Sequence, residues 1–154
     1  MGEASMQGGK LNDSISYFRH YTQISPDAQG YALLGQAYSR MHDYSGARDA
    51  CGKSFEIQRS PDTLSCVAGA DFELRNYKEA AQIFDALDKA AKGYLDANPQ
   101  LLYIAAKSYA GSNQCSKAAA AYKRLLPMMK KGTKDYDSVR KSVADPCPSA
   151  KHSG

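Results

Sequence analysis

Residues 31–51 read YALLGQAYSRMHDYSGARDAC and hold two short apolar stripes on either side of a polar break. The first stripe recurs at steps of three and four residues, which is the spacing of one face of an α-helix, and consists of Tyr31, Leu34, Gly35 and Tyr38. The second stripe has the same spacing and consists of Tyr44, Ala47 and Cys51. The stretch therefore predicts two helices joined by a tight turn.

The same pattern recurs along the chain, which is the signature of a repeat protein. Tyr-x-x-Ala at 44–47 returns at 77–80, and related tetrads stand at 11–14 and 115–118, so that the steps are 33, 33 and 38 residues. Prolines separate the units at positions where one helix can end and the next begin. Small residues at matching places allow the helices to approach closely: Gly35, Ala47, Ala68, Ala80, Ala106 and Ala118.

These residues resemble the tetratricopeptide repeat (TPR) family, whose signature is W-x2-L-G-x2-Y, then A-x3-F, then P. In the unit most similar to that signature the matching residues are Tyr31, Leu34, Gly35, Tyr38, Ala47, Cys51 and Pro61. The next unit keeps Ala80 and Phe84 but has Ala68 and Asp71 in place of the glycine and the second tyrosine. The resemblance implies an all-α fold, a right-handed α-solenoid of antiparallel helical hairpins, and a fragment of a longer TPR-containing protein.

The repeat phase also predicts where the parts begin and end. We expect a half-unit at 9–26, hairpins at 28–60, 61–97 and 99–130, and a C-terminal capping helix at 131–144. Residues 1–8 are expected to be a disordered or artificial start. Residues 145–154 show no apolar periodicity, so we expect a disordered tail there.

Composition excludes several classes of protein. Val, Ile and Thr together number 11 while Ala alone numbers 23, which argues against an all-β fold. No run approaches the roughly 20 apolar residues that a membrane span requires, and the start of the chain does not read as a secretory signal. We therefore expect a soluble protein without a membrane span, and a cytoplasmic setting is favoured.

Basic residues are concentrated near the end of the chain, where 117–154 hold nine Lys and Arg against three Asp. A basic segment can attract nucleic acid. These side chains are nevertheless spread over amphipathic sequence without interleaved aromatic residues, which favours a solvated helix face over a nucleic-acid surface.

The four cysteines are Cys51, Cys66, Cys115 and Cys147, and no CxxC pair occurs. The three histidines are scattered, so neither a metal site nor any other cofactor is expected. A chain of 154 residues does not require covalent staples. We therefore expect structural or incidental thiols.

Residues 47–54, ARDACGKS, satisfy a relaxed phosphate-loop expression. Phosphate binding by such a loop requires a preceding buried strand and a flexible glycine turn. Neither stands here, because Ala47 and Cys51 occupy helical repeat positions. The carboxylates of Asp85 and Asp88 share a helix face and are read as solvent-facing rather than as an acid and base pair. An enzyme is not expected.

The resemblance also implies a binding site, because in TPR proteins the first helices of the hairpins line a concave groove that holds a peptide or helix. Carried over by alignment, the groove residues here are Gln29, Gln36, Arg40, Asp62, Ser65, Phe72, Glu73, Tyr103 and Lys107. Phe72 and Tyr103 are the expected anchors. Chaperone-binding members clamp a terminal carboxylate with Lys and Asn, but only Lys107 offers a cation at a matching place, so no such clamp is expected.

The sequence thus predicts a non-catalytic protein-binding module that acts as a scaffold or adaptor. Its partner would be a protein or peptide whose identity these residues do not give. One alternative is a structural spacer segment of a longer repeat protein. An RNA-binding repeat and a nucleotide-binding enzyme using Lys53 are less favoured.

Overall fold

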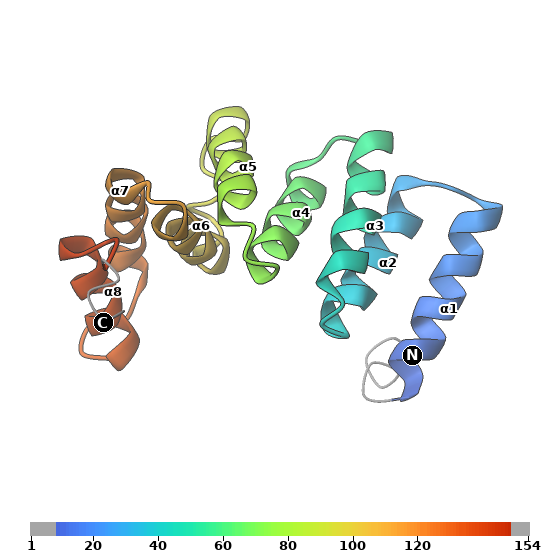
Figure 1. Ribbon diagram of the computed structural model, residues 1–154, viewed down its shortest axis with the longest axis horizontal. Coiled ribbons are helices and arrows are strands. Elements are labelled where there is room, and N and C mark those ends of the chain that lie inside the picture. Colours follow the sequence, from blue (N-terminus) through green and yellow to red (C-terminus); the bar gives the residue numbers. More distant parts are fainter. Residues whose placement is uncertain (1–8, 149–154) are drawn as a thin grey trace, which may run out of the picture. The chain divides into compact units, whose positions relative to one another are not determined.

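The computed structural model describes residues 9–148, and every regular element in that part of the chain is helical. The α-helices are shown in Figure 1 and are, in order, α1 Gly9–Ile24, α2 Ala28–Arg40, α3 Tyr44–Ile57, α4 Pro61–Glu73, α5 Tyr77–Ala90, α6 Pro99–Gly111, α7 Cys115–Leu125 and α8 Lys134–Ala144. A short 3-10 helix, η2 Leu126–Met128, lies between α7 and α8. The predicted all-α class is confirmed.

The chain divides into two compact units, Met1–Arg75 and Asn76–Gly154. In the first unit α1 packs against α2, α2 against α3 and α3 against α4, and α2 also contacts α4. In the second unit α5 packs against α6, α6 against α7 and α7 against α8. Within each unit every helix therefore buries a face against the next helix of the chain.

Small residues stand where the helices come closest. Gly35 of α2 faces Cys51 of α3 so closely that a Cβ atom at residue 35 would overlap the Cys51 Sγ atom and lie 3.3 Å from its backbone nitrogen. The five alanines predicted at matching places are all fully buried; they are Ala47, Ala68, Ala80, Ala106 and Ala118.

Polar side chains cap four of the helices. The carboxylate of Asp27 accepts a hydrogen bond from the Gly30 nitrogen at 2.6 Å and another from the Tyr21 hydroxyl at 2.8 Å. Both bonds favour the charged form and hold the pKa of Asp27 below its ordinary value. The other capping residues, Asp43, Ser60 and Thr133, each accept from a backbone nitrogen of the first turn, which satisfies an otherwise unpaired donor.

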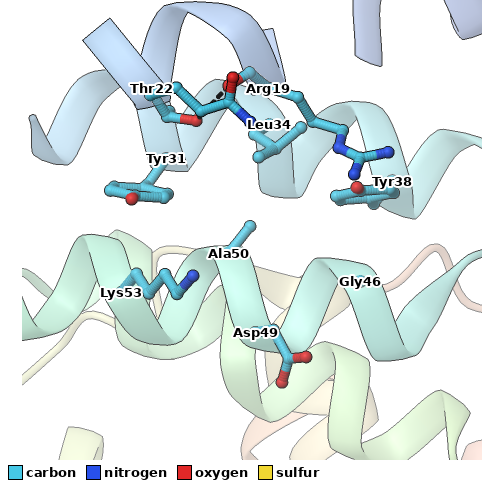
Figure 2. Close-up of a pocket in the computed structure, with 10 residues that line it drawn as sticks. Arg19, Thr22, Tyr31, Leu34, Tyr38, Gly46, Asp49, Ala50 and Lys53 are labelled. Atoms are coloured by element: carbon cyan, nitrogen blue, oxygen red, sulfur yellow. Dashed lines mark hydrogen bonds between the residues drawn. The ribbon is translucent and has the colours of Figure 1, made fainter. Parts of the chain in front are cut away.

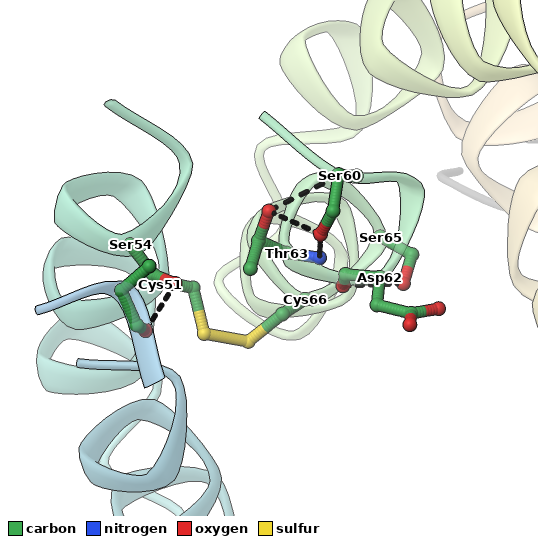
Figure 3. The surroundings of a disulfide bond; sticks show 8 residues. Cys51, Ser54, Ser60, Asp62, Thr63, Ser65 and Cys66 are labelled. Atoms are coloured by element: carbon green, nitrogen blue, oxygen red, sulfur yellow. Dashed lines mark hydrogen bonds between the residues drawn. A yellow bond between two sulfur atoms is a disulfide. The ribbon is translucent and has the colours of Figure 1, made fainter. Parts of the chain in front are cut away.

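All four cysteines are oxidised, whereas the sequence favoured structural or incidental thiols and did not show whether any of them pair. Cys51 of α3 is bonded to Cys66 of α4, with 6.0 Å between the two Cα atoms (Figure 3). Cys115 at the start of α7 is bonded to Cys147, with 5.4 Å between the Cα atoms. The sequence could not show the pairing because chain length says only that staples are not required, whereas pairing depends on which helix faces meet.

The segment after α8 also differs from its expected disorder over 145–148. The Asp145 nitrogen bonds to the Lys141 carbonyl at 2.9 Å, and Cys147 is tied to α7 by its disulfide. The rest of the expected tail and the expected disordered start at 1–8 lie outside the described residues. None of the described helices has the length and apolar content of a membrane span.

The two carboxylates of α5 that were expected to face solvent, Asp85 and Asp88, form ion pairs with cations of α7. Arg124 grips both carboxylate oxygens of Asp88 at 2.7 and 2.9 Å and contacts Asp96 at 2.8 Å. Lys117 pairs with Asp85, whose other oxygen accepts from the Tyr109 hydroxyl at 3.0 Å. These contacts hold α5, α6 and α7 in register within the second unit.

Six tyrosines of α2, α3, α5, α6 and α7 divide into two groups by burial. Tyr109 and Tyr122 are each 5% exposed and belong to the core. Four others are only half-buried, because they lie at the open edges between helices, and these are Tyr31, Tyr38, Tyr44 and Tyr77. A tyrosine at these repeat positions therefore does not by itself indicate a fully buried side chain.

The close approach of α2 and α3 gives a matched pair of substitutions. We expect Gly35→Ala to lower the free energy of unfolding by about 1–3 kcal/mol, because the new methyl group overlaps a sulfur that the disulfide holds in place. Gly52→Ala, inside α3, has no neighbouring atom within 4 Å and should instead raise the free energy of unfolding by about 0.5–1 kcal/mol. Urea unfolding followed by helical circular dichroism measures both. Equal effects of the two substitutions would contradict the tight contact.

Candidate functional site

The expected groove residues lie on three helices. Gln29, Gln36 and Arg40 are exposed on α2, which contacts α4 directly. On α4, Asp62 and Glu73 are exposed and Phe72 is half-buried.

Ser65 departs from its expected role in the groove. It is buried, and its hydroxyl donates to the Asp62 carbonyl at 2.8 Å. Figure 3 shows the Ser65 side chain beside Asp62 in the first turns of α4. Ser65 therefore contributes little surface to a partner.

Tyr103 and Lys107 lie one helical turn apart on α6 and are close together in space. The Tyr103 side chain is 38% exposed, and the Lys107 Nζ atom lies 5.7 Å from the centre of its ring. On its inner side the Tyr103 ring meets the edge of the Tyr122 ring, with 6.4 Å between the centres. An aromatic side chain held in this way loses little conformational freedom on binding.

Tyr103 lines a cavity of about 360 Å³ in the second unit, which we call the Tyr103 pocket. Three consecutive elements form its walls. The start of α6 contributes Pro99, Gln100 and Tyr103. The end of α7 contributes Leu125, and Met129 follows η2. The first turns of α8 contribute Asp135, Ser138 and Val139. Its size lies within the range of about 300–1,000 Å³ that is typical of ligand pockets.

Local sequence explains how α8 closes this pocket. After α7 the chain turns through η2, which contains Pro127, and through Gly132, whose φ of +81° favours glycine. The Thr133 hydroxyl then accepts from the Tyr136 nitrogen at 3.2 Å and begins α8. Val139 is 3% exposed, so the inner face of α8 is held against its neighbours.

The second disulfide holds the same region together. It joins Cys115, the first residue of α7, to Cys147, which follows α8. The Cys147 sulfur also lies 3.7 Å from the Ala110 carbonyl oxygen of α6. Of the three helices that line the Tyr103 pocket, α7 is therefore cross-linked to the segment that follows α8.

The pocket combines an apolar interior with a polar rim. Leu125, Met129 and Val139 supply apolar surface, while Gln100, Asp135 and Ser138 supply polar groups. Such a lining suits an apolar side chain of a ligand whose flanking backbone or polar groups remain at the rim. Repeat alignment identified Tyr103 but missed Met129 and Val139, because it does not say how the turn after α7 places α8.

The phosphate-loop sequence at 47–54 lies wholly within α3. Ala47 and Ser54 are fully buried, and the Ser54 hydroxyl donates to the Ala28 carbonyl at 2.7 Å. The segment is therefore a helix, as its repeat positions predicted, and it does not form a glycine loop. Among the described residues, no group of three or more His, Cys, Asp and Glu side chains is placed to hold a metal ion.

Comparison of the chain with models of known protein families and with curated proteins finds no match. A function therefore has to be inferred from the residues and geometry described above.

Burial around Tyr122 and Tyr109 makes stability depend on pH in the alkaline range. Burial raises the pKa of both hydroxyls above the ordinary value of 10.0, and for Tyr109 the hydrogen bond to Asp85 raises it further. As the pH rises, the unfolded chain therefore releases these protons before the folded chain does. The contribution of the two hydroxyls to the free energy of unfolding is complete below pH 10 and is lost as the pH rises above it. We expect the variant Tyr109→Phe plus Tyr122→Phe to lose less stability on going from neutral to alkaline pH.

Urea unfolding at a series of pH values measures this difference. Tyr17→Phe is the control, because its ring is 65% exposed and both buried hydroxyls remain. The control should follow the wild-type pH dependence. An identical alkaline loss in the double variant and the wild type would contradict the predicted coupling.

Proposed function

We propose that this chain is a TPR-like repeat module that binds a peptide or helical segment of a partner protein without catalysing a reaction. Consecutive helices pack with small buried residues at matching places, which supports the repeat assignment. Such a module would serve as a scaffold or adaptor.

The finer architecture forms part of the same proposal. The helical hairpins would stack as a right-handed α-solenoid, and α8 would cap its end. In support of a cap, α8 buries Val139 on its inner side while its outer residues are polar or charged. An end helix with a polar outer face keeps a repeat array soluble.

The observation that carries the proposed function is the Tyr103 pocket. It places a partly exposed tyrosine, supported by Tyr122 and adjacent to Lys107, at the mouth of a cavity with apolar walls. Rigid aromatic side chains beside a small cavity are typical anchors of protein interfaces. We propose that one large apolar side chain of the partner enters the cavity and that Gln100, Ser138 and Lys107 contact the residues around it.

The alternatives have less support. A nucleotide enzyme would need a phosphate-binding loop, whereas residues 47–54 are helical. An RNA-binding surface would have to lie on the basic final third, where three of the cations, Lys117, Arg124 and Arg140, each pair with an aspartate, which lowers the positive charge that they offer to RNA. The spacer alternative differs from binding in predicting no dependence on Tyr103.

Selection of peptides against the intact chain tests the function. Displayed random peptides should be enriched for a consensus with one large apolar residue. Tyr103→Ala should then weaken binding of that peptide by at least tenfold, which corresponds to about 1.4 kcal/mol. Fluorescence anisotropy with the labelled peptide gives the affinities.

Two further variants separate binding from folding. Ser138→Arg adds a bulky charged group at the exposed rim of the pocket without removing any buried contact, and it should weaken binding as well. Tyr17→Ala removes an exposed tyrosine of the first unit and should leave the affinity unchanged. Failure to enrich a consensus, or equal affinity of all variants, would remove the proposed function.

The disulfides argue against the cytoplasmic location that the sequence favoured. Disulfide bonds persist in oxidising compartments and are rare in the cytosol, where thiols are kept reduced. Both bonds join helices that also pack together, so the folded state favours them. We propose that the protein folds in an oxidising compartment rather than in the cytoplasm.

Removing the first disulfide measures its contribution. Cys51→Ala plus Cys66→Ala should lower the free energy of unfolding by about 2–4 kcal/mol, because the bond restricts the unfolded chain. Wild-type protein treated with a reducing agent should unfold at a still lower urea concentration, because reduction breaks both disulfides. Should reduction leave the unfolding midpoint unchanged, or should thiol labelling find free cysteines in oxidised protein, the proposed setting would be rejected.

A further inference from the structure

A second cavity of about 350 Å³ lies in the first unit among α1, α2 and α3 (Figure 2), and we call it the Tyr31 pocket. Tyr31 and Tyr38 of α2 line one side of it, with Leu34 between them and Ala50 of α3 opposite. Arg19 of α1 and Lys53 of α3 are its two cations. None of the residues expected to form the peptide groove lines this pocket.

The two cations and the two tyrosine hydroxyls of the Tyr31 pocket have no ion-pair or hydrogen-bond partner in the part of the chain that the structure describes. Arg19 and Lys53 are exposed, and neither forms an ion pair with a residue that the structure describes. Over the same residues, the hydroxyls of Tyr31 and Tyr38 make no hydrogen bond. By contrast, the hydroxyls of Tyr21 and Tyr109 both donate to carboxylates of the chain.

One carboxylate, Asp49, is among the residues that line the pocket. In Figure 2 its side chain points away from the two tyrosines, on the opposite side of α3. The Arg19 side chain extends toward Tyr38 in the same view. The side of the pocket next to the tyrosines therefore carries two positive charges and hydroxyl donors, and it attracts an anion.

The second unit contains the same pair of side chains with an anion bound to it. There the Lys117 Nζ atom lies 5.7 Å from the centre of the Tyr109 ring, and both side chains hold Asp85, through an ion pair and through a hydrogen bond of 3.0 Å. In the Tyr31 pocket the Lys53 Nζ atom lies 5.5 Å from the centre of the Tyr31 ring. This chain thus already uses a lysine over a tyrosine ring to hold a carboxylate.

We propose that the Tyr31 pocket binds a carboxylate side chain of an acidic peptide segment belonging to a partner protein. The carboxylate accepts from Lys53 and the Tyr31 hydroxyl, while Arg19, at the Tyr38 end of the pocket, adds a second positive charge, and the aliphatic stem of the side chain rests on Leu34. The apolar surface of Leu34 and Ala50 suits a carbon stem, which inorganic phosphate lacks. The site is independent of the proposed function, because it uses other helices and does not involve Tyr103.

Fluorescence anisotropy with a labelled oligo-glutamate peptide tests the site on the intact chain. Oligo-glutamate should bind, and its affinity should fall with added salt because exposed charges are screened. Arg19→Gln plus Lys53→Gln should weaken binding by at least about tenfold, since the charge-assisted bond from Lys53 and both positive charges of the pocket are lost. Tyr31→Phe keeps the ring under Lys53 but removes the hydroxyl, and it should weaken binding by roughly threefold to tenfold.

Matched controls separate this site from the general positive charge of the protein. Lys89→Gln plus Lys92→Gln removes the same charge from two exposed lysines of the second unit and should leave the affinity unchanged. Tyr103→Ala, which damages the proposed peptide pocket, should also leave it unchanged. Labelled oligo-glutamine, which lacks the charge, should not bind.

The outcomes decide for or against the site. Selective loss in the Arg19 and Lys53 variant and in Tyr31→Phe, with both controls unaffected, supports it. Equal loss in the Lys89 and Lys92 variant overturns it, because the interaction is then one of net charge. It is likewise overturned if oligo-glutamate does not bind, including the case in which the protein binds inorganic phosphate instead. Circular dichroism of each variant should match the wild type.

Discussion

Contact between α2 and α3 requires that residue 35 carry no side chain. Gly35 lies against Cys51, and that close approach brings Ala47 and Ala50 of α3 into the core as well. Because helices of this length are marginal by themselves, their stability depends on burying such faces against neighbours. Cys51 also fixes α4 to α3, because its sulfur is bonded to Cys66 of α4. Gly35 thus permits the close packing of α2 on α3, and the disulfide ties α3 to α4.

Much of the fold could be predicted from the sequence, because helical periodicity and small residues are local signals. The all-α class follows from them, and so do the buried alanines at matching places. The cysteine pairing could not be predicted in this way. It depends on which faces of successive helices meet, and spacings of 15 and 32 residues between the partners do not report that. For a similar reason the alignment placed Ser65 in a groove, although its hydroxyl is used by the first turn of its own helix.

The candidate sites were harder to predict than the helices. Alignment found Tyr103 and Lys107 because they project from a repeat helix at recognisable positions. It missed Met129 and Val139, which reach the same cavity only because the chain turns at η2 and Gly132 before α8 begins. It also gave no sign that Tyr31 and Tyr38 are half-buried and border a cavity whose two cations form no ion pair with any residue that the structure describes. In a stacked helical protein the pockets arise where neighbouring elements fail to fill the space between them, and a sequence motif does not record such gaps.

Cross-linking of Cys115 to Cys147 makes a closed covalent ring from the part of the chain that contains α7, η2 and α8. The bend between α7 and α8 includes exposed residues such as Met128 and Gly132, where a protease would find accessible backbone. A cut at this bend opens the ring but does not divide the molecule, because the two pieces remain joined through sulfur. The C-terminal helix would then stay tethered to α7 after cleavage, and only reduction would release it.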